Sequence, residues 1–274
     1  MMSDILYSSV PLILYSFGAL FSEFAGVLAV FADGVINFGA FLSYAFTVYS
    51  GNAVAGVFAS CFVCTVSVLG FAWITEKTKM NPFLSATALN LLFSSLCSVF
   101  SSLLFKTRGV LVENPLVQNV THAKTVILIL ALFIVILSMC FLFKTPHGLY
   151  LRITGSDSDV LEVKGISPSS LRIYAWGITA FFCALAGGIL AVRINSFVPN
   201  ISAGRGWIAL AAVFLGRKKV LWVTLSVCVF CAADYFGINL QAILPSTAMN
   251  AVPYFAALLF LAFVPAKKKL YEPK

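Results

Sequence analysis

Charge is scarce in this 274-residue chain: only 10% of its residues are Asp, Glu, Lys or Arg, whereas 61% are hydrophobic. A soluble domain of this length could not hide that much apolar surface in one core. Apolar runs of roughly 20 residues recur, and each is long enough to cross the ~30 Å hydrocarbon layer as a helix. The sequence therefore predicts an all-α, polytopic transmembrane bundle of about eight or nine membrane segments, forming a single domain over residues 1–274.

The chain also lacks the residue patterns of an enzyme. It contains no G-x-x-x-x-G-K-[ST] phosphate loop, and its two histidines, His122 and His147, fall in predicted loops on opposite sides of the membrane. Without a phosphate loop the chain cannot bind ATP in the P-loop manner. We therefore expect no catalytic residues and no cofactor or metal in this chain, so that energy must come from a partner or an ion gradient.

Cysteine is present, but in positions that favour packing. The pairs Cys61/Cys64 and Cys228/Cys231 have zinc-like C-x-x-C spacing, yet both lie inside apolar runs. Four thiolates near the bilayer centre would carry a large desolvation cost. Small apolar residues on a helix face, where helices approach closely, are the better interpretation.

The apolar runs give a specific set of expected helices, one of them too short to cross a membrane. The seventh has thirteen residues and spans only ~20 Å, which is typical of a half-crossing buried against protein. The expected ranges are 5–21, 34–50, 52–74, 83–105, 125–143, 173–192, 204–216, 220–236 and 248–265.

The net charge of +8 comes from short basic clusters between apolar runs, such as residues 77–79, 217–219 and 267–269. This placement is typical of loops at an anionic cytoplasmic surface and not of a nucleic-acid-binding protein. With nine crossings and the C-terminus in the cytoplasm, thirteen of the eighteen basic residues lie on the inner side. The positive-inside rule therefore favours a cytoplasmic C-terminus.

A few polar residues lie in or beside the membrane segments. Intramembrane charges are costly and by default suggest a pathway or a paired interior position. The alternative to a pathway role for the acids is a structural position in a solvated turn. For Asn90 the alternative is an interhelical hydrogen bond, which contributes ~0.6 kcal/mol on average. The candidates for a substrate pathway are Asp33, Asn37, Asn90, Arg205, Trp207 and Asp234.

Six segments, taken in order, resemble one family. They are SEFAGVLAVFADGVINFGAF (22–41), NPFLSATALNLLFSSL (81–96), GLYLRITGSDSDVLEVKGIS (148–167), ALAGGILAV (184–192), SAGRGWIALAAVFLGRKKVL (202–221) and VPYFAALLFLAF (252–263). Together they are similar to the ABC-transporter permeases of the ribose and branched-chain amino-acid type, closest to the nucleoside and riboflavin group. The resemblance covers about residues 11–265.

This resemblance implies an ABC importer permease fold in a bacterial inner (cytoplasmic) membrane, carrying a nucleoside or riboflavin, with a simple sugar less expected. The implied partners are an ATP-binding subunit that uses ATP and Mg²⁺, a second related permease and a solute-binding lipoprotein. An ion-coupled secondary transporter, using Asp33 or Asp234, is the alternative.

One charge-rich segment, residues 144–172, interrupts the apolar pattern on the predicted inner side. Its Ser156–Gly165 stretch has helix-start chemistry, because Ser156 or Ser158 can cap and acids favour the positive helix end. The sequence predicts a short helix here, which by the resemblance would couple to the ATPase. The coupling residues would be Asp157, Asp159, Val160, Leu161, Val163 and Gly165, with the three apolar side chains forming the docking face.

Overall fold

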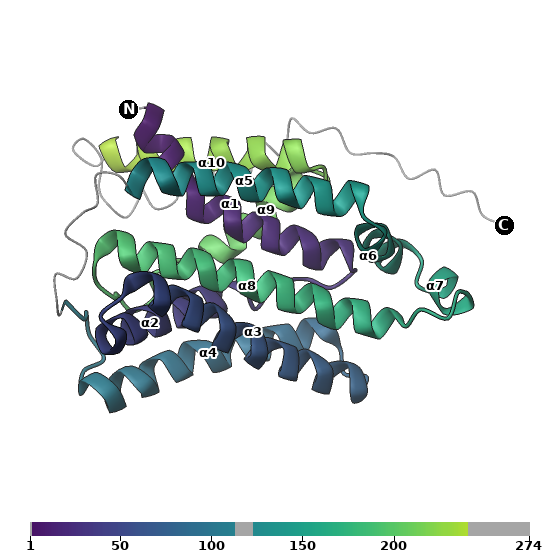
Figure 1. Cartoon of the computed structure of the whole chain (residues 1–274), viewed down its shortest axis with the longest axis horizontal. Helices are drawn as coiled ribbons and strands as arrows, with labels where there is room; N and C mark the ends of the chain where they lie inside the picture. Colours follow the sequence, from purple (N-terminus) through teal and green to yellow (C-terminus); the bar gives the residue numbers. More distant parts are fainter. Residues whose placement is uncertain (1, 113–122, 241–274) are drawn as a thin grey trace.

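The computed structural model describes residues 2–112 and 123–240, which form helices joined by turns and loops, with one isolated bridge between Leu111 and Phe197. Ten helices occur in the described ranges (Figure 1). They are α1 (Met2–Phe24), α2 (Ala32–Ser50), α3 (Ala53–Lys77), α4 (Pro82–Phe105), α5 (Ala123–Lys144), α6 (Pro146–Ser156), α7 (Asp159–Val163), α8 (Pro168–Ile194), α9 (Arg205–Leu215) and α10 (Val220–Leu240).

Eight of the nine expected helices match an observed helix to within a few residues at each end. The ninth, 248–265, lies outside the described residues, as do the basic residues of the C-terminal stretch. The sequence predicted one helix inside 144–172, but the structure contains two, α6 and α7. The signal for α6 was available: Thr145 accepts a hydrogen bond from the Gly148 N–H at 3.2 Å, and Pro146 occupies the first turn.

Similar caps fix the starts of α3 and α4. The Asn52 side chain accepts from the Val54 N–H at 2.9 Å, and the Asn81 side chain accepts from the Phe83 N–H at 2.9 Å, just before Pro82. Among the described residues, three helices, α3, α4 and α8, are long and apolar enough to cross a membrane. The chain is therefore a helical membrane protein with several spanning segments.

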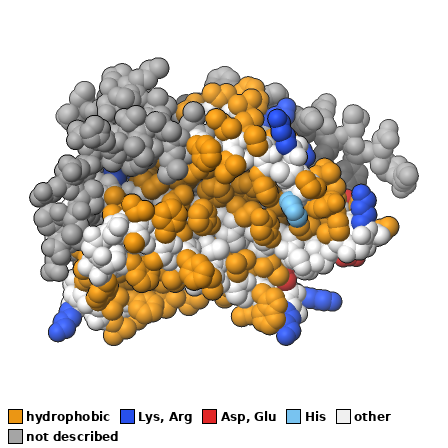
Figure 2. Space-filling model, in the orientation of Figure 1, with side chains coloured by type: hydrophobic (Ala, Val, Ile, Leu, Met, Phe, Trp, Pro, Cys, Tyr) orange, Lys and Arg blue, Asp and Glu red, His pale blue; other side chains and the backbone are white. Residues whose placement is uncertain are grey.

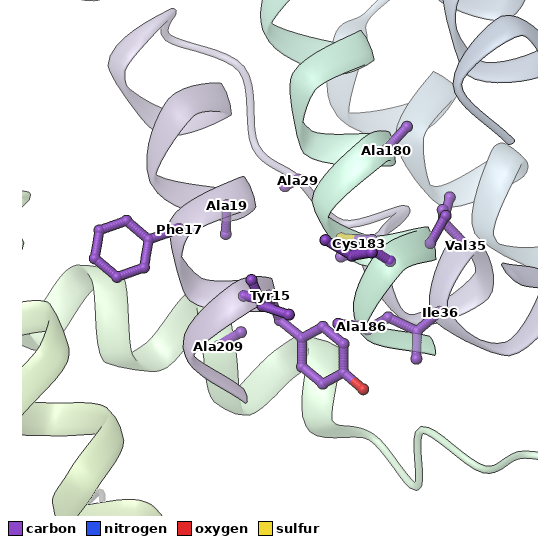
Figure 3. Packing of buried hydrophobic residues seen from close by; sticks show 14 of the residues in the cluster. Tyr15, Phe17, Ala19, Ala29, Val35, Ile36, Ala180, Cys183, Ala186 and Ala209 are labelled. Carbon is purple, nitrogen blue, oxygen red and sulfur yellow. The ribbon is translucent and has the colours of Figure 1, made fainter. Parts of the chain in front are cut away.

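The core is built from small side chains on α8 packed against α1 and α2. Figure 3 shows Cys183 and Ala186 of α8 between Tyr15 of α1 and Ile36 of α2. A Cβ on Gly39 would lie 2.8 Å from the Ala184 Cα, so only a glycine permits this approach. Close backbone packing of this kind is how membrane helices associate without a hydrophobic driving force.

One end of the bundle carries α6 and α7 (Figure 1). The α1–α2, α3–α4 and α9–α10 connections lie at the same end, where two ion pairs join neighbouring segments. Arg172 at the start of α8 lies 3.9 Å from Glu76 at the end of α3. Lys218, in the α9–α10 turn, forms a 3.0 Å ion pair with Glu23 at the end of α1. Glu23 therefore has the structural role of holding two turns together.

Candidate functional site

Two helices begin inside the bundle instead of at its ends. Asn90 contacts the start of α2 and lies eight residues into α4, so α2 begins about 12 Å in from the end that carries α7. The short helix α9 starts beside it, since the Gly206 N–H donates to Asp33 Oδ1 at 3.3 Å. The half-crossing expected for 204–216 is thus α9, and its N-terminus meets that of α2.

Side-chain oxygens satisfy the exposed N–H groups at this junction. Asp33 places its carboxylate at the positive end of α9, where a negative charge is stabilised. Asn90 accepts from the Gly34 N–H through Oδ1 and so caps α2. A Cβ on Gly206 would lie 2.8 Å from the Asp33 backbone nitrogen, so the two helix starts touch directly.

Asn37 has a different position from the other pathway candidates. It is 5% exposed, and its amide is committed to the loop before α9: Nδ2 donates to Ser202 Oγ at 2.8 Å, and Oδ1 accepts from the Ser202 N–H at 3.0 Å. Asn37 therefore holds the loop that positions α9 and lies inside the protein.

The remaining candidates form a half-exposed polar group, which we call the junction seam: Asp33, Asn90 and Arg205. Trp207, two residues into α9 from Arg205, is 50% exposed. Asp234 belongs to α10, but its side chain lies outside the described part of the structure. The structure thus brings three of the six candidates together and leaves Trp207 beside them.

A row of hydroxyl groups on α4 continues from the seam, and the sequence interpretation missed it. Thr87, Ser94, Ser95, Ser98 and Ser102 fall within a ~100° arc of the helix and extend over about 22 Å. Ser94, Ser95 and Ser98 are exposed. Two of the five bond back to their own helix, Thr87 to the Phe83 carbonyl at 2.9 Å and Ser94 to the Asn90 carbonyl at 3.0 Å.

This row, the hydroxyl face, runs along a helix of membrane length and shares its arc with the exposed side chains of Leu84 and Leu91. Leu92, Val99 and Leu103 form an apolar face beside it. The recurrence of hydroxyls three, four and seven residues apart, at 94, 95, 98 and 102, inside an apolar run was the signal available in the sequence. Exposed hydroxyls along a spanning helix suit a polar surface or a polar solute better than hydrocarbon.

At the α7 end, the structure assigns the predicted coupling residues to distinct positions. The Asp157 carboxylate accepts from the Asp159 N–H at 3.2 Å, so Asp157 caps α7, while Ser158 forms no capping bond. Gly165, with φ of +72°, ends the turn, and its N–H donates to the Glu162 carbonyl at 2.9 Å. α7 projects from the bundle (Figure 1).

The expected docking face of α7 is smaller than the sequence suggested. Leu161 is fully buried against the chain itself, whereas Val160 is 43% and Val163 is 90% exposed. Leu161 therefore fixes α7 within the α6–α7 segment, and the apolar surface that α7 offers outward comes from the two valines. The acids Asp157, Asp159 and Glu162 lie exposed around them.

The cysteine pairs do not assemble a metal site in the described ranges, where no group of three or more His, Cys, Asp or Glu side chains converges. Cys61 and Cys64 are buried in α3. They serve as small packing residues, as the apolar runs around them suggested.

A membrane protein with an intramembrane polar seam and a small projecting helix belongs to the class of transport subunits, and sequence comparison identifies the family. Residues 1–264 match the family described as branched-chain amino acid transport system / permease component. The chain belongs to this family. It is a permease component of an ABC transporter and not an enzyme.

Individual relatives carry related names. The chain is 28% identical over 292 residues to the nucleoside ABC transporter permease protein NupC of Lactococcus lactis, covering 95% of this chain and 90% of the relative. It is 26% identical over 279 residues to the guanosine ABC transporter permease protein NupQ of Bacillus subtilis, covering 92% and 87%. A putative glucose ABC transporter permease protein, TsgC13 of Haloferax volcanii, is 28% identical over 256 residues, covering 88% and 77%.

A solved structure supports the fold. PsaBC from Streptococcus pneumoniae, in complex with a Fab, aligns with a TM-score of 0.60 at 12% identity, over 98% of this chain and 93% of that chain. At this identity the likeness concerns the fold alone.

Proposed function

We propose that this chain is the membrane subunit of an ATP-driven importer and that the junction seam and the hydroxyl face of α4 line its solute path. The observation that carries the proposal is the meeting of α2 and α9 inside the bundle, with Asp33 and Asn90 at their N-termini. Interrupted helices near the membrane midplane are how transporters place polar groups on a solute.

The solute class follows from the chemistry of these surfaces. The groups of the seam and the hydroxyl face are hydroxyls, the Asn90 amide, the Asp33 carboxylate already bonded to Gly206 and the Arg205 guanidinium, so they suit a hydroxyl-bearing polar molecule that also offers hydrogen-bond acceptors. Two relatives are named as nucleoside or guanosine permeases and one as a putative glucose permease. A nucleoside is the best single candidate, whereas the names of these relatives give riboflavin no support.

The partners follow from family membership. An ATP-binding subunit would use ATP and Mg²⁺ at the predicted cytoplasmic end, which carries α7. A second related permease would complete the path, and a solute-binding lipoprotein would deliver the solute from outside. The bacterial inner membrane, with the C-terminus in the cytoplasm, is the location that fits this assembly.

The experiment measures uptake of labelled nucleosides and glucose in cells that express or lack the gene. Nucleoside uptake that depends on the gene and on ATP supports the proposal. Ser98→Leu, which puts an apolar side chain into the hydroxyl face, should lower kcat/KM for uptake by about tenfold, the equivalent of losing one hydrogen bond of ~1.4 kcal/mol.

The adjacent variant Val99→Leu is the matched control, because Val99 is 48% exposed but lies outside the hydroxyl face. Equal losses in the two variants would contradict the path assignment. Transport by the purified chain alone, driven by an ion gradient and indifferent to ATP, would instead establish the ion-coupled alternative.

A further inference from the structure

A second surface feature, a cavity, is apolar and so differs in chemistry from the junction seam. An apolar cavity of about 630 Å³ opens between α1, α3, α5 and α8. Its walls are formed mainly by aromatic and aliphatic side chains, among them Phe21, Leu69, Leu137, Phe141 and Phe182. Hydrophobic side chains, orange in Figure 2, cover much of the face of the molecule drawn there.

The cavity extends along the membrane helices themselves. Its residues on α8 run from Tyr174 to Phe182, which corresponds to about 12 Å along the helix axis. The walls offer very few polar groups, so a sugar or nucleoside would lose its hydrogen bonds to water without replacing them. An occupant must therefore be largely apolar.

One end of the cavity has a different character. Lys144, Thr145 and Tyr174 line it, and the Lys144 side chain is exposed. α5 ends at Lys144 and α6 begins at Pro146, so the positive end of α6 points to this region as well. A lysine at the end of a spanning helix, with a tyrosine nearby, is typical of the headgroup level of a membrane.

This polar end lies on the side of the bundle that carries α6 and α7, where the basic turns collect. A transmembrane helix of a partner would satisfy the apolar walls, but it would give the Lys144 ammonium no counter-charge. A lipid with an anionic headgroup satisfies both, because its acyl chain fills the walls and its phosphate lies near the ammonium.

We propose that this cavity is a binding site for an anionic phospholipid of the inner leaflet, with an acyl chain between α5 and α8 and the phosphate at Lys144 and the start of α6. The site is separate from the solute path and adds a lipid dependence that the permease function does not itself require.

The test is native mass spectrometry on the full chain in detergent, titrated with phosphatidylglycerol or phosphatidylcholine of the same acyl composition. One lysine near the surface contributes about 1 kcal/mol to an anionic lipid, so wild type should bind phosphatidylglycerol ~5-fold more tightly than phosphatidylcholine. Lys144→Gln should remove that preference. Cys140→Trp, which fills the cavity from an exposed position on its wall, should weaken the binding of both lipids.

Lys79→Gln is the control, since Lys79 is an exposed base at the same end that does not line the cavity, and it should keep the preference. Equal binding of both lipids to wild type would overturn the proposal, and so would equal losses in the two lysine variants. Unchanged phosphatidylglycerol binding in Cys140→Trp would place the lipid elsewhere. Cross-linking from Cys140 to a partner protein would assign the cavity to a helix.

Discussion

At the scale of single residues, two kinds of side chain decide how this protein packs. Glycines let helices touch, as where Gly187 of α8 meets the Ile36 carbonyl of α2, and side-chain amides tie segments that are far apart in sequence. Asn37 binds a loop 165 positions away, and Asn90 caps a helix 56 positions away. Neither tie depends on the apolar pattern that produces the helices.

The Gly187 contact provides a direct stability test. Gly187→Ala would place a methyl group against the Ile36 carbonyl and 3.0 Å from the Ala40 nitrogen, both of them backbone atoms that cannot turn away. Overpacking of this kind costs about 1–3 kcal/mol, so thermal unfolding in detergent should occur several degrees lower.

Gly70→Ala is the matched control, because a Cβ at Gly70 in α3 would meet nothing within 4 Å. The added helix propensity should leave that variant as stable as wild type or slightly more stable. If both variants unfold at the wild-type temperature, α2 and α8 are not as close as the structure has them.

At the scale of secondary-structure elements, α7 combines an internal anchor with an outward apolar tip. Leu161 is buried, and it accepts from the Ile166 N–H at 3.0 Å through its carbonyl, which closes the turn after α7. Val163 is 90% exposed with acids around it. Because α7 is fixed through Leu161 and exposes Val163, we expect it to transmit movement from a partner subunit. The matching surface of that partner would be an apolar pocket with basic residues at its edge.

Val163→Asp should therefore reduce ATP-dependent uptake by about tenfold, since a charge desolvated at a contact costs more than ~1.4 kcal/mol, while expression and thermal stability stay at wild-type levels. Uptake, ATP hydrolysis and unfolding temperature are measured together. Val112→Asp is the control, because Val112 is 73% exposed next to the Leu111–Phe197 bridge at the other end of the bundle.

Leu161→Asp should behave differently from Val163→Asp. Its charge would be buried within the chain, so we expect loss of folded protein instead of uncoupling. Wild-type uptake in Val163→Asp would remove the coupling role that we propose for α7.

At the scale of the whole molecule, the described bases are unequally divided between the two ends. Those of the α3–α4 turn, the α9–α10 turn and the α5–α8 connection lie at the end that carries α7, whereas Lys106 and Arg108 follow α4 at the other end. By the positive-inside rule we predict that the α7 end faces the cytoplasm.

A labelling experiment tests this orientation. In intact cells, a membrane-impermeant maleimide should label Arg108→Cys but not Lys79→Cys above the background of the native cysteines. After permeabilisation both should react, because both positions are exposed. The reverse pattern would invert the topology and move α7 away from any cytoplasmic ATPase.

The apolar runs and the polar segment at 144–172 were sufficient to predict the class, eight helices and the helix α7, because membrane helices record their length and boundaries in local composition. The candidates Asp33, Asn90 and Arg205 were also recognisable, since charge and amides are costly within hydrocarbon. The hydroxyl face could also have been predicted from the helical spacing of Ser and Thr residues in α4, but the sequence interpretation missed it.

Tertiary structure alone decided which of these residues meet. The shortness of 204–216 indicated a half-crossing. Nothing local in the sequence says that α2 also begins inside the bundle beside α9, that Asn37 is turned inward to Ser202, or that Leu161 is buried and Val163 exposed. These outcomes depend on contacts between segments up to 173 residues apart, as between Asp33 and Gly206. The sequence determined a membrane bundle with polar groups in it, and helix packing determined which of those groups form a site.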